Sequence, residues 1–267
     1  MSSTTSPDPA PLEARPASLP RVDVVILCWN DEAQATVASA SALASTGVSV
    51  SVTVVDNGSD VPLRFRPDVH LVRNGRNLGV AAGRNLGAGK GSAPFVCFLD
   101  SDAALDPNCL EGLVHAFDDP DVAVAAPVFH GHRPEHTAGR APTLARKMAR
   151  AAGMTATYAP GTGTGPVRVV DFAIGACQLL RRDAFFEIGG FDERYFYGPE
   201  DVDLCLRLAD AGYRVVQVDG ARCRHDARRA SRRLWTARGF RHAMAVLQHL
   251  WIRRCRRGVV PSTAETA

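Results

Sequence analysis

Residues 22–30 read VDVVILCWN, an unbroken run of mostly β-branched and apolar residues that ends at a polar side chain. Such a run is typical of a strand that is buried on both faces of a parallel sheet. The alanine-rich residues 32–45 predict a helix, and apolar runs over 51–60 and 68–74 predict two more strands. Strands that alternate with helices predict an α/β fold, in which helices flank a mostly parallel central sheet built from right-handed crossovers.

The same alternation continues through most of the chain. Further strands are predicted over 93–102, 121–129, 167–175, 176–182 and 213–220, and further helices over 78–91, 106–119, from Asp183 onward and over 199–211. Asp106 is the expected N-cap of helix 106–119, with Pro107 at its first position. Residues 130–166 break the pattern and are interpreted as a variable insertion, of the kind that forms a lid or contacts an acceptor.

The two ends of the chain differ from this body, which we place at residues 21–230. Residues 1–20 contain five prolines but neither a basic n-region nor an apolar run, so they predict a disordered leader and not a signal peptide. Residues 231–267 are predicted to form a basic amphipathic helix and tail. The seven cysteines form no CxxC pair, and several lie in apolar runs, which favours reduced thiols and a cytoplasmic location.

The formal net charge of +3 hides an uneven distribution. Residues 222–257 hold twelve arginines and one acid, Asp226, and therefore carry a charge of +11. The remaining 19 basic and 27 acidic residues give the body a charge of −8. Arginines on an amphipathic helix favour peripheral contact with the inner face of a membrane, or a homodimer interface. Nucleic acid is not an expected partner, because aromatic residues are not interleaved as single-strand binders require.

Polar side chains stand at the ends of three predicted strands: Asn30, Asp56-Asn57 and Asp100-Ser101-Asp102. Ligands of open α/β sheets bind beyond the carboxyl ends of the strands, so these three ends predict a single site. Asp100 and Asp102 can share a divalent cation that in turn binds a diphosphate, although an acidic turn that caps a helix is the alternative. For Asp56 the alternative is an Asx turn, which Asn57-Gly58 would favour.

The stretch RNLGVAAGRN places small and polar residues around a predicted helix N-terminus. Asn77, Gly79 and Gly83 would let the backbone approach a phosphate closely, and Arg84 could reach a phosphate oxygen. Tight packing of the helix against the sheet is the alternative interpretation. His225 follows a strand and precedes Asp226, which makes it a candidate metal ligand, although most lone histidines are structural.

Residues 189–207 read GGFDERYFYGPEDVDLCLR and mix acidic with aromatic residues. Glu200 and Asp201 end an aromatic-rich loop at a predicted helix start, the setting of a partly buried general base. Capping of the helix by an acid in its first turn is the alternative, and it explains one of the two carboxylates.

Taken together, these motifs resemble those of the inverting family 2 glycosyltransferases with the GT-A fold, and most closely the rhamnosyltransferase-like branch. The resemblance covers residues 21–230. The blocks that carry it are VDVVILCWN, VVDNGSD, NLGVAAGRNLG, FLDSD, GACQLLRRDAFFEIGGFDERYFYGPEDVDLCLRLADAGYRV and RHD. Cys28-Trp29 stands where the family tends to have Thr-Tyr.

The resemblance implies a nucleotide-sugar donor, for which we expect a UDP- or dTDP-sugar. The implied donor contacts are Cys28, Trp29, Asn30 and Asp56 around the base, Arg84 at the nucleotide or diphosphate, and Asp100 at the ribose or at metal-bound water. Asn77, Gly79, Gly83 and Ser101 are expected, from their places in the motifs, to line the same donor site.

The resemblance also implies the catalytic residues. Asp102 and His225 would bind Mg²⁺ or Mn²⁺, Asp201 would be the catalytic base, and Glu200 would shape the pocket of a glycan, lipid-linked or small-molecule acceptor. Two alternatives stay open: a non-catalytic protein that binds sugar nucleotides, and a sugar-nucleotide nucleotidyltransferase. The latter usually carries a Gly-rich phosphate loop directly after the first strand, where this chain has CWNDEAQ.

Overall fold

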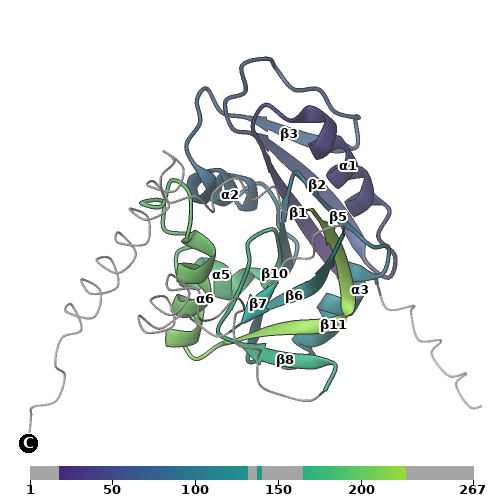
Figure 1. Cartoon of the computed structure of the whole chain (residues 1–267), viewed down its shortest axis with the longest axis vertical. Coiled ribbons are helices and arrows are strands. Elements are labelled where there is room, and N and C mark those ends of the chain that lie inside the picture. Colours follow the sequence, from purple (N-terminus) through teal and green to yellow (C-terminus); the bar gives the residue numbers. More distant parts are fainter. Residues whose placement is uncertain (1–17, 132–136, 140–164, 227–267) are drawn as a thin grey trace, which may run out of the picture.

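The computed structural model describes residues 18–131, 137–139 and 165–226 (Figure 1). The predicted leader, most of the predicted insertion and the predicted basic helix and tail lie outside the described residues. Among the described residues, no helix combines the length and the apolar composition that crossing a membrane requires.

The first half of the domain alternates strands and helices as the sequence predicts. Its elements are β1 (Arg21–Cys28), α1 (Glu32–Leu43), β2 (Ser49–Asp56), β3 (Val69–Arg73), α2 (Val80–Ala88) and β4 (Phe95–Asp100). β1 pairs in parallel with both β2 and β4, and β2 pairs in parallel with β3. Because the chain leaves β1 toward one side of the sheet and later returns to its other side, the carboxyl ends of β1, β2 and β4 lie next to each other at a switch point.

The second half adds shorter strands and the remaining helices. They are β5 (Ala103–Leu105), α3 (Cys109–Val114), a 3₁₀ turn η1 (His115–Asp118), β6 (Val122–His130), β7 (Ala138–Gly139), β8 (Val167–Val170), β9 (Phe172–Ala173), β10 (Cys177–Arg181), α5 (Arg182–Glu187), α6 (Glu200–Asp210) and β11 (Arg214–His225). The main sheet has the order β3-β2-β1-β4-β10-β6-β11-β5, with β8 also paired to β11. The α/β fold class is therefore confirmed.

The sheet is more mixed than the alternation predicts. β10 lies antiparallel between β4 and β6, and β11 is antiparallel to both β5 and β8. The sequence of β10 is buried on both faces, as a parallel strand would be, so its apolar pattern carries no sign of its direction. Parallel pairing returns between β6 and β11.

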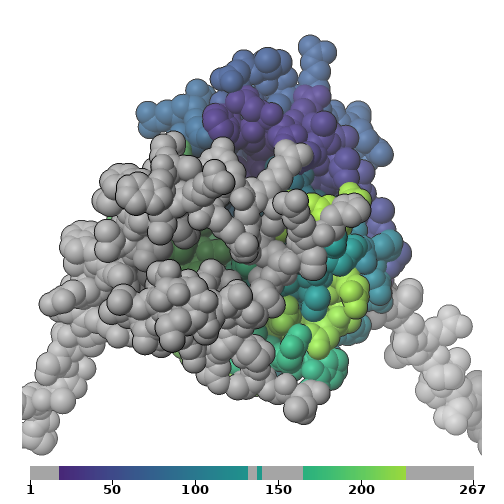
Figure 2. All heavy atoms as spheres, viewed as in Figure 1, coloured from purple at the N-terminus to yellow at the C-terminus, as the bar shows by residue number. Residues whose placement is uncertain are grey.

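Helices cover both faces of the sheet (Figure 1). One buried cluster contains residues of α1 and α3 together with one face of the central strands, and the other contains residues of α2, α5 and α6 with the opposite face. In the space-filling view the yellow-green atoms of β11 lie beside teal atoms from the middle of the chain, as its pairing with β6 requires (Figure 2).

Two predictions, on the start of helix α3 and on the length of strand β11, are wrong in detail. Helix α3 begins at Cys109, and its N-cap is Asn108, not Asp106. The Asp106 carboxylate lies instead 2.9 Å from Nε2 of His130, at the end of β6. β11 continues to His225, well beyond the predicted 213–220, because it also pairs with the short strand β5 that follows the Asp100-Ser101-Asp102 turn. This pairing brings His225 to that turn.

Candidate active site

The ends of β1, β2 and β4 lie next to each other, as predicted. In the strand register Cys28 of β1 lies opposite Asp56 of β2, and Leu27 lies opposite Asp100 of β4. The Asp56 side chain is buried, and its Oδ1 accepts a hydrogen bond from the Ser59 backbone N–H at 2.9 Å. Asp56 therefore shapes the turn after β2, and a contact with a nucleotide base stays a prediction.

The three residues at the end of β1 have different environments. Cys28 belongs to the buried core, and burial is the main reason that the pKa of its thiol is raised to about 11. Trp29 is 56% exposed, so its ring is the part of this segment that is accessible for stacking. Asn30 has a left-handed φ of 57°, and its side-chain nitrogen donates to Asp60 Oδ2 at 2.9 Å. Cys28 therefore packs in the core, and Asn30 holds the loop that contains Asp60.

A buried asparagine organises the loop before α2. Asn57 Nδ2 donates to Asn77 Oδ1 at 3.0 Å and to the carbonyl oxygen of Gly79 at 3.1 Å. Asn57 Oδ1 accepts from Asn74 Nδ2 and from the Leu78 backbone N–H. Asn77 and Gly79 therefore lie at the site because Asn57 holds them there. The sequence places Asn57 at a strand end of the predicted site, but it predicts only a turn for this residue and not this bridging role.

α2 packs closely against β1. A Cβ at Gly83 would lie 2.4 Å from Cδ1 of Leu27, so this glycine is needed for the contact between helix and sheet. The packing interpretation of Gly83 is the one that the geometry supports. Arg84, the next residue, is consequently held over the ends of the central strands.

Arg84 is a buried cation that joins two carboxylates. Its side chain is only 4% exposed; Nη2 lies 2.6 Å from Asp100 Oδ1, and Nη1 lies 3.4 Å from Glu200 Oε1. Burial lowers the pKa of the guanidinium, but the charges of Asp100 and Glu200 outweigh this effect and raise it. Arg84 and Glu200 are both buried, and removing one partner of a buried pair costs about 3–5 kcal/mol of folding free energy.

Glu200 and Asp201 begin α6 and differ in their contacts. Glu200 is buried, and burial, followed by the charge of Asp201, raises its pKa to about 7, while Arg84 acts in the opposite direction. Within the described part of the chain, Glu200 Oε2 is buried and has no hydrogen-bond partner. Asp201 accepts hydrogen bonds from the backbone N–H groups of Gly175 and Val202, at 2.9 and 2.7 Å.

Burial is the largest influence on Asp201 and raises the pKa of its carboxyl, although the two backbone N–H groups oppose the shift. A carboxylate with a raised pKa is a better proton acceptor than an ordinary aspartate. Arg84 couples this pair to Asp100, so the two acidic motifs of the sequence lie at one place.

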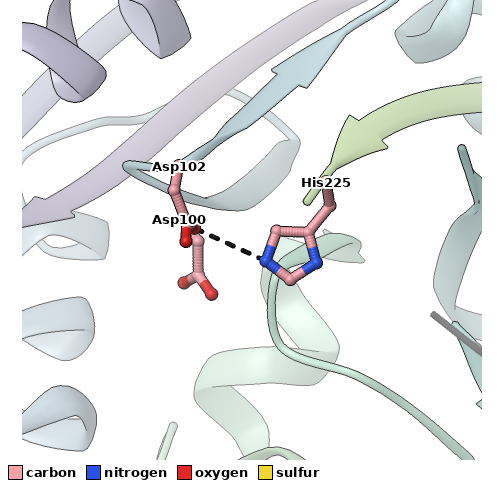
Figure 3. Close-up of side chains that lie close together, drawn as sticks. All are labelled: Asp100, Asp102 and His225. Atoms are coloured by element: carbon pink, nitrogen blue, oxygen red, sulfur yellow. Dashed lines mark ion pairs between the residues drawn. The ribbon is translucent and has the colours of Figure 1, made fainter. Parts of the chain in front are cut away.

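Asp100, Asp102 and His225 converge on one point (Figure 3). Each offers one ligand atom, and these atoms lie within 4.8 Å of one another. Nε2 of His225 lies 3.4 Å from Oδ1 of Asp102, and Ser101 lies in the turn between the two aspartates. Two carboxylate oxygens and one imidazole nitrogen are ligand types that divalent cations take in proteins. The chemistry of this set therefore fits a divalent cation.

His225 is buried next to these acids. Burial lowers the pKa of its imidazole, but the hydrogen bond and charge of Asp102 outweigh burial, so the net pKa is raised. A divalent cation bound at this set would therefore have to compete with a proton for this side chain.

The sheet order and the Asp100-Asp102-His225 set define an α/β domain with a candidate cation site at the ends of its central strands. Comparison with known proteins names the family. The chain matches the family model "Glycosyl transferase family 2" over residues 23–189, and "N-terminal domain of galactosyltransferase" over residues 170–229. The chain therefore belongs to glycosyl transferase family 2.

Two curated relatives come from Mycobacterium tuberculosis. Pre-mycofactocin glycosyltransferase is 34% identical over 200 residues, a match that covers 70% of this chain and 39% of the relative. N-acetylglucosaminyl-diphospho-decaprenol L-rhamnosyltransferase is 32% identical over 220 residues and is matched over 70% of this chain and 69% of its own length. The chain thus spans about two fifths of the length of the first relative.

A solved structure supports the fold. The mannosyltransferase PcManGT of Pyrobaculum calidifontis, determined in complex with GDP-Man and Mn²⁺, aligns with a TM-score of 0.63 at 17% identity, over 91% of this chain and 68% of that one. The predicted GT-A fold is therefore confirmed. The predicted resemblance to family 2 glycosyltransferases is confirmed as well, and one of the matched relatives is a rhamnosyltransferase.

Proposed function

We propose that this chain is a metal-dependent inverting glycosyltransferase, which moves a sugar from a nucleoside diphosphate donor to an acceptor hydroxyl. One observation carries the proposal: Arg84 bridges Asp100, on the side of the cation-binding set, and Glu200, on the side of the expected base. The family membership and the solved relative that contains GDP-Man and Mn²⁺ support it.

The acceptor is activated by Asp201 in this proposal. Asp201 accepts the proton of the acceptor hydroxyl as the oxygen attacks the anomeric carbon, and the diphosphate leaves from the opposite face of the sugar. A single displacement inverts the configuration at that carbon. General base catalysis of this kind contributes about 10²- to 10⁴-fold to the rate.

Other residues position the reactants. Trp29, exposed at the end of β1, is available to stack on the nucleotide base, and Asp56 closes the turn beside it. A Mn²⁺ or Mg²⁺ ion held by Asp102 and His225, with Asp100, would neutralise negative charge on the leaving diphosphate. Glu200, next to the base, would lie on the acceptor side.

The first experiment identifies the donor. Thermal-shift measurements with UDP-, dTDP- and GDP-sugars in the presence of Mn²⁺ should show one nucleotide class that raises the melting temperature, and excess chelator should abolish the shift. NMR of the transfer product then reports the anomeric configuration. Retention of configuration would show that the enzyme is not inverting. Full turnover in excess chelator would show that it does not depend on a metal.

The two alternative functions give different results in the same assays. A non-catalytic sugar-nucleotide-binding protein would bind the donor and neither transfer nor slowly hydrolyse it. A nucleotidyltransferase would release pyrophosphate from a nucleoside triphosphate in the presence of a sugar phosphate. Metal-dependent release of a nucleoside diphosphate from the donor, without pyrophosphate, is the result that favours glycosyl transfer.

The cellular setting also belongs to the proposal. A cytoplasmic protein whose basic C-terminal residues 231–267 contact the anionic inner face of a membrane would meet a lipid-linked acceptor there. Flotation with liposomes that contain anionic lipid tests this contact, and failure to co-float removes it. A homodimer through the same segment would instead appear as a doubled mass in light scattering.

A further inference from the structure

Gly175 lies between the buried arginine and the expected base. It is in the short connection between β9 and β10, and it is buried. Its carbonyl oxygen accepts a hydrogen bond from Arg84 Nη2 at 2.8 Å, and its N–H donates to Asp201 Oδ2 at 2.9 Å. The same Nη2 of Arg84 donates to Asp100 Oδ1 at 2.6 Å. A continuous chain of contacts therefore runs from Asp100 through Arg84 and Gly175 to Asp201.

The position of Arg84 requires a glycine at 175. A Cβ on this residue would lie 2.6 Å from Nη1 and 3.3 Å from Cζ of Arg84. Gly175 is not among the residues with a positive φ, so its backbone would accept alanine without strain. The requirement for glycine at this position thus comes from the close approach of the guanidinium.

Arg84 is fixed on every side that the structure describes. Its side chain is 4% exposed, and Nη1 reaches Glu200 Oε1. Its Cζ lies 5.5 Å from the centre of the Phe191 ring. A guanidinium is planar and holds its partners in a fixed geometry, which a lysine ammonium cannot reproduce. With so little of its surface exposed, Arg84 is poorly placed to contact a donor directly.

We propose that Arg84 and Gly175 are positioning residues, which set the location of the Asp201 carboxylate relative to Asp100. In this view Arg84 acts through Asp100 and Gly175 and is not itself a phosphate ligand. The roles of Asp100 and Asp201 in this link rest on the glycosyl transfer proposed above. The physical contact between Arg84 and Gly175 does not depend on that activity.

A double-mutant cycle tests the link, with Gly175→Ala, Arg84→Lys and the double variant. A misplacement of about 1 Å in a catalytic group typically costs about 10²-fold. We therefore expect each single variant to lower kcat by about 10²-fold while the KM for the donor changes much less. Lysine lacks the guanidinium that the new Cβ would meet, so the two substitutions should not add their effects. The kcat of the double variant should therefore also fall by about 10²-fold, and not by about 10⁴-fold, the product of the two single losses.

The control is Gly220→Ala in β11, where a Cβ meets no atom within 4 Å and the backbone φ is not positive. It should keep the wild-type kcat. Losses in kcat that multiply in the double variant, or a Gly175→Ala variant with near wild-type kcat, would overturn the link.

Urea unfolding of the same four proteins gives a readout that needs no substrate. Gly175→Ala should lower the unfolding midpoint in the wild-type background and much less in the Arg84→Lys background. Equal shifts in both backgrounds would disprove the contact, even if the wild type transfers sugar normally. If Gly175→Ala alone does not fold, a folded double variant supports the link and an unfolded one overturns it. A wild type without transferase activity would instead refute the proposed function, while the unfolding cycle still decides the contact.

Discussion

His225, at the end of strand β11, and Asp102, in the turn between β4 and β5, reach the same point, with Nε2 of His225 3.4 Å from Oδ1 of Asp102. Asp100 completes the set, and the turn that holds both aspartates leads into β5, which pairs with the end of β11. The antiparallel pairing of β5 with β11 is therefore what adds His225 to the acid-x-acid motif and makes a candidate three-ligand site.

We predict that His225→Ala weakens Mn²⁺ binding by at least about tenfold, because even a residue that only supports a metal ligand typically contributes that much. Isothermal titration of Mn²⁺ with the nucleoside diphosphate present measures the change. Because Asp102 raises the pKa of His225, protons compete with the cation, and wild-type affinity should fall as the pH is lowered. His130→Ala, which removes the pair with Asp106, is the control; equal affinities of wild type and His225→Ala would exclude the histidine as a ligand.

We predict that Asp201→Asn lowers kcat by about 10²- to 10⁴-fold and leaves donor affinity nearly unchanged, because asparagine keeps an oxygen for the Gly175 N–H but cannot accept the acceptor's proton. Steady-state kinetics and calorimetric donor binding separate the two effects. Asp210→Asn, exposed at the other end of α6, should behave like the wild type. Near wild-type turnover in Asp201→Asn would show that another group takes the proton.

We predict that Glu200→Gln changes how stability depends on pH. Burial raises the pKa of Glu200 from 4.5 to about 7, so the folded protein favours the protonated carboxyl. The resulting stabilisation is complete below the unfolded pKa of 4.5 and is lost as the pH rises through about 7. Relative to Glu200→Gln, the wild type should therefore lose stability between about pH 5 and pH 8, by up to about 3 kcal/mol.

Urea unfolding at several pH values measures this difference. Glu193→Gln, in the exposed loop that precedes Tyr195, is a suitable control and should show no such trend. A constant difference between wild type and Glu200→Gln from pH 5 to pH 8 would show that Glu200 keeps an ordinary pKa in the folded protein.

The strand ends were predictable from the sequence because each of them follows an apolar run that only a buried strand explains. β1, β2 and β4 carry Cys28, Asp56 and Asp100 to one edge, and this required no knowledge of the long-range contacts. The meeting of Asp102 with His225 was predicted from the resemblance, but the strand pairing that produces it was not, since β5 is only three residues long.

Contacts set by tertiary approach were not predictable in the same way. Asn57 looks like a turn residue in VVDNGSD, and nothing local distinguishes an asparagine that bridges two loops from one that faces water. Gly175 has no positive φ, so it lacks the usual sign of an essential glycine, and only the position of Arg84 explains it. The burial of Arg84 likewise depends on how closely Gly83 lets α2 approach β1.

We predict that Gly79→Ala destabilises the protein and slows turnover. Gly79 has a φ of 85° and a ψ of 177°, a region that essentially only glycine adopts, and a Cβ there would lie 2.6 Å from the carbonyl oxygen of Phe196. The Val80 N–H donates to that same oxygen at 2.8 Å, so strain at Gly79 is passed to the loop that leads into Glu200. We expect a loss of about 1–3 kcal/mol in urea unfolding and a lower kcat. Gly75→Ala is the control, because a Cβ there meets nothing within 4 Å, and it should change stability by less than about 0.5 kcal/mol. A Gly79→Ala variant with the same small effect would show that the contact between α2 and the Phe196 loop is not required.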